Sequence, residues 1–308
     1  MLFIKQLIQS IKDKKSVVCM GLDPRINQEG TIPNYLVEEF LEPNDIILEF
    51  NKALIEECHE LIPVIKPQIA FYEKYDSLQA LKDTIKFAHK HDLMVILDSK
   101  RNDIGSTSEA YADSTFQVYG ADACTLNAYF GFDGIKPYIE RYSEKGMFIL
   151  VKTSNPSSSD FQNLFSAKLD DLDPSNIEID KQAVKLERNY VFMARLVHSW
   201  GKNMAQYHEF NNLGVVIGAT FPDELKYLRS IVPSSFILIP GYGAQGGSVS
   251  DIKYGFQNNG LGGIVNSSRG ITYAYRNKKQ YSPEDFCMAA KDEIRDMNLS
   301  INKAIGLT

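Results

Sequence analysis

Three features of the sequence predict an α/β fold built as a single (β/α)8 barrel, the TIM-barrel architecture. Eight short apolar runs, rich in β-branched residues, recur along the 308 residues, and helical patterns separate them. Most of the runs are continuous rather than alternating, which is typical of strands covered on both faces. No linker, repeat or block of charge divides the chain. We therefore expect residues 1–308 to form one domain.

The eight expected strands follow one another in a regular order. They cover residues 16–23, 63–71, 93–100, 121–129, 147–154, 213–220, 235–243 and 262–268. A doubly wound open sheet is the alternative arrangement, but its dinucleotide-binding form needs GxGxxG after an early strand. The first strand here ends in GLDPR instead, which favours the barrel.

Helical spacing is clearest in two of the segments between strands. In residues 76–92, apolar side chains recur at helical intervals, and Asp76 or Ser77 can cap the start. Residues 183–201 show a second helical pattern, which Gly201 would close as its C′ residue. The polar stretch 153–181 lies between these helices. We expect the wider region 153–190 to be a mobile loop over the active-site end of the barrel.

Charge and composition exclude several classes of partner. The formal net charge is −6 and the pI is near 5.5, so we expect no nucleic acid and no anionic membrane as partner. No stretch reaches the roughly 18 uncharged apolar residues of a membrane helix, and the N-terminal 16 residues indicate an amphipathic helix rather than a signal peptide. Four widely spaced cysteines are typical of reduced core thiols. These features predict a cytoplasmic protein.

Polar residues gather at the carboxyl ends of the expected strands, where barrels carry their chemistry. They are Asp23, Lys66, Asp98, Lys100, Asn127, Thr153, Ser154, Gln245 and Arg269. Each of them alone could be a solvated loop residue. Together they form a ring, which chance placement on a surface explains poorly.

The stretch VILDSKRNDIGST, residues 95–107, holds the densest charge. Strand alternation puts Asp98 and Lys100 on one face, and Asp103 follows. A lysine between carboxylates stays an ammonium, which suits proton donation better than nucleophilic attack. Lys66 interrupts another apolar strand and needs an acidic partner if it is buried. A purely structural network of ion pairs is the alternative for these groups.

The last two strands end in PGYGAQGGS (240–248) and VNSSRG (265–270). Barrels often bind phosphate at this place through backbone N–H groups and a helix N-terminus. Arg269 adds a bidentate donor. His89 and His91 resemble a pair of metal ligands, but they lack acidic partners at suitable spacing and are more typical of a helix end.

With these motifs in their order, the sequence resembles the orotidine 5′-monophosphate (OMP) decarboxylase family, in its longer branch. The most specific motif is D-x-K-x-x-D at Asp98, Lys100 and Asp103, followed by Ile104 and Thr107. GLDPR, VIKPQIAFYE, TSNP, GYGAQGG and VNSSRG support it, so the resemblance covers roughly residues 16–275. The family implies decarboxylation of OMP to UMP and CO2 in de novo pyrimidine synthesis, with neither a metal ion nor an organic cofactor.

The resemblance also implies roles for individual residues. Lys100 would protonate the C6 carbanion, and Asp98 would lie by the substrate carboxylate. Asp103 would reach into the active site of a partner subunit, with Thr107 touching its ligand, so the unit would be a homodimer with shared sites. Further contacts are implied for Lys66 and Asp23 on the ribose, Asn127 near the charged network, Ser154 on the pyrimidine, and Gln245 and Arg269 on the phosphate.

Three other functions stay open. A magnesium-dependent sugar-phosphate decarboxylase shares the D-x-K-x-x-D strand, but Lys66 stands where that enzyme needs an acid. A Schiff-base aldolase would use Lys100 as a free amine. A catalytically silent nucleotide-binding barrel would leave costly buried charges without a use. Within the resemblance, Pro67 and Gln68 depart from the small or apolar pair expected after Lys66.

Overall fold

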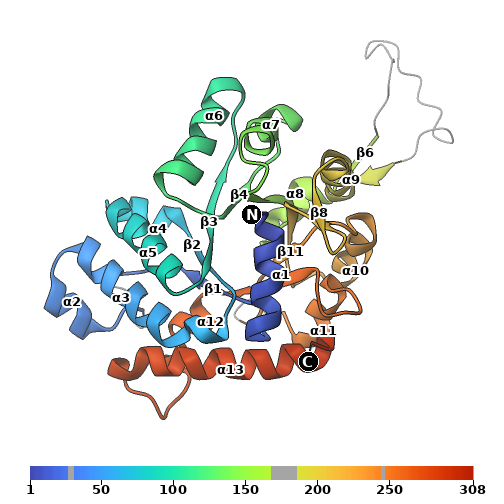
Figure 1. Cartoon of the computed structure of the whole chain (residues 1–308). Helices are drawn as coiled ribbons and strands as arrows, with labels where there is room; N and C mark the ends of the chain where they lie inside the picture. The colour runs from blue at the N-terminus through green and yellow to red at the C-terminus, as the bar shows by residue number, and fades with distance from the viewer. Residues whose placement is uncertain (27–30, 168–185, 244–246, 308) are drawn as a thin grey trace.

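Eight parallel strands close into a barrel in the computed structural model, which describes residues 1–26, 31–167, 186–243 and 247–307 (Figure 1). The strands are β1 (Val18–Leu22), β2 (Val64–Pro67), β3 (Met94–Arg101), β4 (Ala123–Leu126), β5 (Gly146–Lys152), β10 (Leu213–Ile217), β11 (Ile237–Pro240) and β12 (Gly263–Ser267). Their order around the barrel is β1-β12-β11-β10-β5-β4-β3-β2. The predicted α/β barrel is therefore confirmed, and all eight expected strands belong to it.

The barrel strands are buried almost throughout, as their continuous apolar sequences predict. Every residue of β1, β2, β4, β10 and β12 is buried. Polar exceptions gather at the carboxyl end, where β3 changes from buried to partly exposed after Asp98. Most strands are shorter than expected because the chain turns toward the next helix as soon as it leaves the barrel. Residues 69–71, for example, already belong to a helix.

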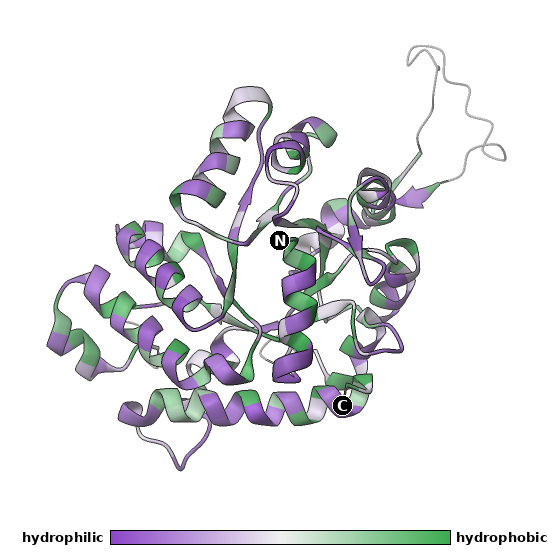
Figure 2. Ribbon diagram, viewed as in Figure 1, coloured by the Kyte–Doolittle hydropathy of each residue, from purple (hydrophilic) through white to green (hydrophobic). Residues whose placement is uncertain are grey.

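Helices surround the barrel, with their apolar sides against the strands and their polar sides outward (Figure 2). They are α1 (Phe3–Lys14), α2 (Asn34–Phe40), α3 (Pro43–Cys58), α4 (Ile69–Lys74), α5 (Leu78–Lys90), α6 (Gly105–Asp113), α7 (Phe132–Arg141), α8 (Ser159–Gln162), α9 (Asn189–Gly201), α10 (Pro222–Ile231), α11 (Val249–Ile252), α12 (Arg269–Thr272) and α13 (Phe286–Ile305). Two-residue ladders join β6 (Phe165–Ser166) to β7 (Glu187–Arg188) and β8 (Gln206–Tyr207) to β9 (Phe210–Asn211).

The structure corrects three local predictions about helix ends. Ser77 precedes α5, but its hydroxyl donates to the carbonyl of Tyr75 and does not cap the helix, and Asp76 has a φ of +50°. Gly201 is the last residue of α9 rather than its C′ residue. A Cβ at Gly201 would lie 2.8 Å from the Asn211 amide nitrogen. Close packing, and not a left-handed turn, therefore requires this glycine.

The helix expected at 183–201 begins only at Asn189. Glu187 and Arg188 pair with β6 instead, and residues 183–185 lie outside the described residues. Residues 168–185 of the region 153–190 that was expected to be mobile also lie outside them.

Two expectations about the whole chain can be compared with the described residues. All four cysteines are free, and three of them are buried. Among the described residues, no helix combines the length and the hydropathy needed to cross a membrane.

Candidate active site

The carboxylate of Asp98, near the end of β3, lies between two lysines. Its Oδ2 accepts a hydrogen bond from Lys66 Nζ at 2.6 Å, and its Oδ1 accepts one from Lys100 Nζ at 2.5 Å. Asp98 is 6% exposed and Lys66 is 5% exposed, whereas the Lys100 side chain is 43% exposed. Lys66 thus has the acidic partner that its buried position requires.

The pKa values of the buried pair move in opposite directions. Burial alone would raise the pKa of the Asp98 carboxyl, but the charges of Lys66 and Lys100 outweigh it and hold that pKa well below its usual range. Burial alone would lower the pKa of Lys66, but Asp98 and then Asp23 raise it above its ordinary value. Both groups of the pair are therefore ionised at neutral pH.

The stretch of β3 that holds Asp98 and Lys100 is irregular. Leu97 pairs with Cys124 of β4 and Arg101 with Leu126, so four steps along β3 match two along β4. Lys100 itself has a φ of +48°, in the left-handed region that lysine rarely adopts. Asp98 and Lys100 therefore meet through a bulge, not through the regular alternation that the sequence suggested.

Thr125 on β4 completes this network, although it was missed in the sequence. Its hydroxyl donates to Asp98 Oδ1 at 2.7 Å and accepts from the backbone N–H of Lys100 at 3.1 Å. Thr125 therefore ties the bulge to the carboxylate. It is 1% exposed within an apolar run, where a threonine gives no sequence signal that separates it from an ordinary core residue.

Two cavities meet at Lys66, Asp98 and Pro240. One has a volume of about 230 Å³ and polar walls, and it is lined by Asp23, Arg25, Lys66, Asp98, Pro240, Gly241, Tyr242, Asn266, Ser267, Ser268 and Arg269. The other, of about 340 Å³, has more apolar walls and is lined by Lys66, Asp98, Lys100, Thr125, Leu150, Thr153, Ser154, Asn155, Val216, Leu238 and Pro240. The charged network therefore lies between a polar lobe and an apolar lobe, as defined by these two lists.

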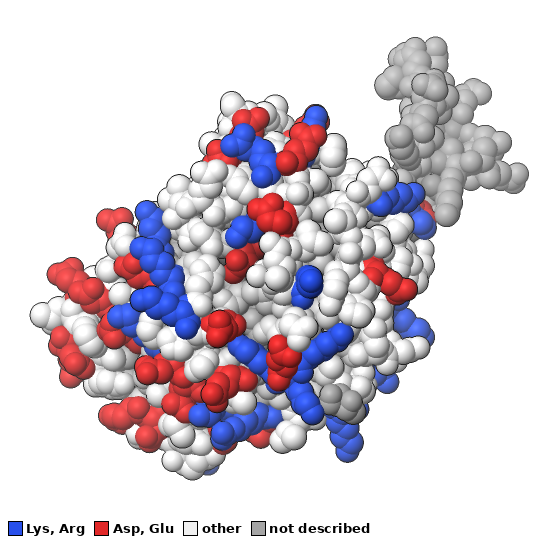
Figure 3. Space-filling view, viewed as in Figure 1, with Lys and Arg blue, Asp and Glu red and all other residues white. Residues whose placement is uncertain are grey.

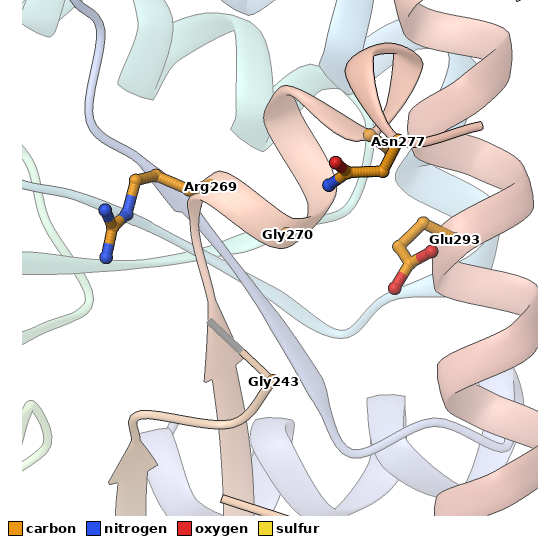
Figure 4. A pocket seen from close by; sticks show the side chains of 6 residues that line it. Gly243, Arg269, Gly270, Asn277 and Glu293 are labelled. Atoms are coloured by element: carbon orange, nitrogen blue, oxygen red, sulfur yellow. The ribbon is translucent and has the colours of Figure 1, made fainter. Parts of the chain in front are cut away.

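The polar lobe ends at the loops after β11 and β12. Arg269 is the first residue of α12, and Figure 4 shows its side chain directed away from Asn277 and Glu293. Those residues line a further cavity of about 410 Å³ next to the polar lobe. Gln245, predicted to hold phosphate with Arg269, lies outside the described residues.

Three predicted site residues do not line either lobe. Asn127 is exposed, accepts a hydrogen bond from the Tyr129 N–H, and lines a separate cavity. Asp103 is partly buried, with its Oδ1 bonded to the N–H of Ile104. Thr107 is exposed on α6. Asp103 and Thr107 thus lie outside the lobes of their own chain.

The histidines form no metal centre. His89 Nε2 lies 2.9 Å from Asp122 Oδ2, and His91 Nδ1 lies 3.0 Å from the carbonyl of Phe87. Across the described part of the chain, no cluster of three or more histidine, cysteine or acidic side chains is arranged to hold a metal ion.

Replacing Lys66 with methionine tests the buried pair. The variant leaves the Asp98 carboxylate buried with one cation fewer, so we expect it to lose about 3–5 kcal/mol of unfolding free energy at pH 7. The pKa of Asp98 is lowered in the native fold. Its ionised form therefore contributes its full stabilisation above the ordinary carboxyl pKa of about 4, and the wild type loses this contribution only as the pH falls from there toward the lowered pKa of the native carboxyl.

In Lys66→Met, burial raises the pKa of Asp98 with one cation fewer to oppose it, so the carboxyl takes up a proton more readily in acid. The loss caused by the substitution should therefore be smaller in urea unfolding at about pH 4 than at pH 7. Lys86→Met is the matched control, because its ion pair with Asp83 is exposed, and it should change stability by less than about 0.5 kcal/mol. A loss for Lys66→Met that is the same at both pH values would contradict the assignment.

Comparisons with known proteins identify the family of this chain. The sequence pattern of the orotidine 5′-phosphate decarboxylase / HUMPS family matches residues 16–282. The orotidine 5′-phosphate decarboxylase of Caldicellulosiruptor saccharolyticus is 37% identical over 98% of this chain and 99% of its own, and that of Petrotoga mobilis is 35% identical over 96% of each. The solved OMP decarboxylase of Leishmania donovani has a TM-score of 0.74 at 28% identity, covering 99% of this chain and 100% of its own. The chain belongs to the orotidine 5′-phosphate decarboxylase / HUMPS family.

Proposed function

We propose that the protein converts orotidine 5′-monophosphate into UMP and CO2, a step of de novo pyrimidine synthesis, without a metal ion or organic cofactor. The observation that carries this proposal is the Lys66–Asp98–Lys100 network between a polar and an apolar lobe. Membership of the family and the names of the relatives support it. Residues 1–308 would form a single barrel domain that carries the catalytic site, and the protein would act in the cytoplasm.

The two lobes suit the two ends of a nucleotide. The apolar lobe would take the pyrimidine, with Ser154 reading its polar edge. The polar lobe would take the ribose beside Asp23 and Lys66, and the phosphate beside Arg269. The family resemblance adds Gln245, outside the described residues, as a further phosphate contact. Backbone N–H groups of the glycine-containing loops can add further phosphate contacts.

The charged network would act on the reacting carbon between the lobes. When the C6–carboxylate bond breaks, CO2 leaves and its bonding electron pair stays on C6. Lys100 then donates a proton from Nζ to C6, which completes UMP and leaves a neutral amine that solvent reprotonates. Asp98 holds the Lys100 ammonium and places a fixed negative charge near the departing carboxylate. Because the charges are already in place, little reorganisation is needed during the reaction.

A homodimer with shared sites would give Asp103 and Thr107 their roles. Neither lines a lobe of its own chain. Large apolar side chains are exposed beside Asp103 and after the neighbouring strand β4: Ile104 is 55%, Tyr129 74% and Phe130 52% exposed. A second copy would cover these side chains and bring Asp103 to the partner's network. Asn127 belongs to the segment after β4 that also holds Tyr129 and Phe130, and it would contact the network from there.

The alternatives fit the site less well. A magnesium-dependent sugar-phosphate decarboxylase needs an acid where Lys66 donates to Asp98, and an ammonium there repels a divalent cation. A Schiff-base aldolase needs a neutral amine, whereas Lys100 is hydrogen-bonded to a carboxylate. A silent nucleotide-binding barrel would carry the desolvation cost of the buried pair without using it.

A spectrophotometric assay tests the function. The purified protein should consume the absorbance of OMP, release CO2 and form UMP, and chelation by EDTA should leave the rate unchanged. Absence of turnover, or turnover that EDTA abolishes and magnesium restores, would contradict the proposal.

Lys100→Ala tests the proton donor. General acid catalysis contributes about 10²–10⁴-fold, so decarboxylation should fall by at least that range, while UMP still binds because the lobes remain. Lys90→Met, on an exposed helix end, is the control and should keep the full rate. If Lys100→Ala retained near-normal turnover, another group would be the proton donor.

Mixing two inactive variants tests the shared site. A hybrid of Lys100→Ala and Asp103→Ala subunits carries both changes in one site and neither in the other. Co-refolded or co-expressed mixtures should therefore recover about a quarter of the wild-type rate, since half of the dimers are hybrid and each has one intact site. No recovery above the separate variants, with dimers present, would contradict sharing of Asp103.

A further inference from the structure

A second buried lysine, Lys152, lies at the end of β5, and the mechanism above does not use it. It has no exposed surface. Its Nζ donates to Ser158 Oγ at 3.0 Å and to Asn163 Oδ1 at 2.9 Å. The same nitrogen lies 4.3 Å from the centre of the Phe221 ring. The ammonium is thus held by neutral oxygens and an aromatic face.

Lys152 differs from Lys66 in its charge balance. No carboxylate among the described residues forms an ion pair with it. Burial lowers the pKa of Lys152, an effect that Glu224 opposes and Arg188 reinforces. A buried cation without an ionic partner is costly, and methionine would fill a similar volume without that cost. Core packing alone therefore does not explain why residue 152 is a lysine.

The two acceptors of Lys152 belong to the turn that follows β5, residues 153–163, which we call the base loop. Ser158 ends the short helix Pro156–Ser158, and Asn163 follows α8. A single buried nitrogen therefore joins the middle and the end of the base loop to the barrel. If the Lys152 ammonium were removed, Ser158 and Asn163 would each lose their hydrogen bond to β5.

The start of the base loop is fixed by a second set of hydrogen bonds. Gln162 Oε1 accepts from the Thr153 N–H at 3.0 Å, and Gln162 Nε2 donates to Thr153 Oγ1 at 2.7 Å. The carbonyl of Lys152 accepts from the N–H of Gly218 at 2.8 Å. A Cβ at Gly218 would lie 2.9 Å from the Ser154 Cα, so this glycine leaves the space that Ser154 occupies.

The result of these contacts is the wall of the apolar lobe. Ser154 and Asn155 line that lobe, two and three residues after Lys152 in the chain. We propose that Lys152 is a positioning residue, whose buried ammonium seats the base loop so that Ser154 and Asn155 face the ring of the bound nucleotide. This inference rests on the proposed function, because it assigns the apolar lobe to the pyrimidine.

The experiment compares two ligands that differ only in the pyrimidine. UMP fills both lobes, whereas ribose 5-phosphate fills the polar lobe alone. In Lys152→Met, calorimetry should show UMP binding weakened by about tenfold or more, the effect of losing roughly one oriented polar contact. Binding of ribose 5-phosphate should stay within about twofold of the wild type. In the OMP assay, KM should rise more than kcat falls.

Asn163 supplies a matched pair of variants that keeps Lys152 itself. Asn163→Asp retains an oxygen acceptor for the ammonium and should bind UMP nearly as the wild type does. Asn163→Ala removes the acceptor and should weaken UMP selectively, in the same direction as Lys152→Met. This pair decides the question if Lys152→Met does not fold. Lys90→Met, far from the base loop, should change neither ligand.

Two results would overturn the inference. One is unchanged UMP binding in Lys152→Met or, if that variant does not fold, in Asn163→Ala. The other is an equal loss for UMP and ribose 5-phosphate, which indicates general damage rather than a displaced base loop. Failure of the proposed function looks different, because wild-type protein would then bind UMP without turning over OMP, or would bind neither ligand.

Discussion

The site depends on keeping one carboxylate ionised inside the barrel. Asp98 is almost fully buried, and its negative charge persists only because Lys66 and Lys100 each donate to one of its oxygens. The three groups come from two neighbouring strands, β2 and β3, so the closed parallel sheet sets their separation. If the register between these strands changed, the pair would be broken and an uncompensated charge would remain in the core.

The same interaction also explains the strained backbone beside it. The pairing of β3 with β4 is irregular between Leu97 and Arg101, and Lys100 lies within this bulge. Lys100 keeps a positive φ because the ion pair and the hydrogen bond from its own N–H to Thr125 hold it there. The backbone strain at Lys100 is therefore coupled to the position of its ammonium group beside Asp98.

The barrel uses its two buried lysines differently. Lys66 faces a carboxylate and forms part of the charged network, whereas Lys152 faces neutral oxygens and holds a loop. The first fixes charge where the two lobes meet, and the second fixes the wall of one lobe. Both lie at the carboxyl ends of their strands, where side chains can leave the apolar interior and still remain out of water.

The amino-acid sequence was enough to predict the eight strands, the barrel and the grouping of Asp98, Lys100 and Lys66, because local apolar patterns indicate which segments are buried strands and in which order they follow. It also placed Asp23, Ser154 and Arg269 at the correct end. Thr125 and the bonding of Lys152 came only from the tertiary structure. Their hydrogen bonds join residues on different strands or loops, and residue type alone does not distinguish a buried threonine or lysine that binds from one that merely packs. The role of Gly201 was mispredicted for the same reason. Asn211 follows it by ten residues in the sequence but packs against it in space, and this contact leaves no room for a Cβ at position 201.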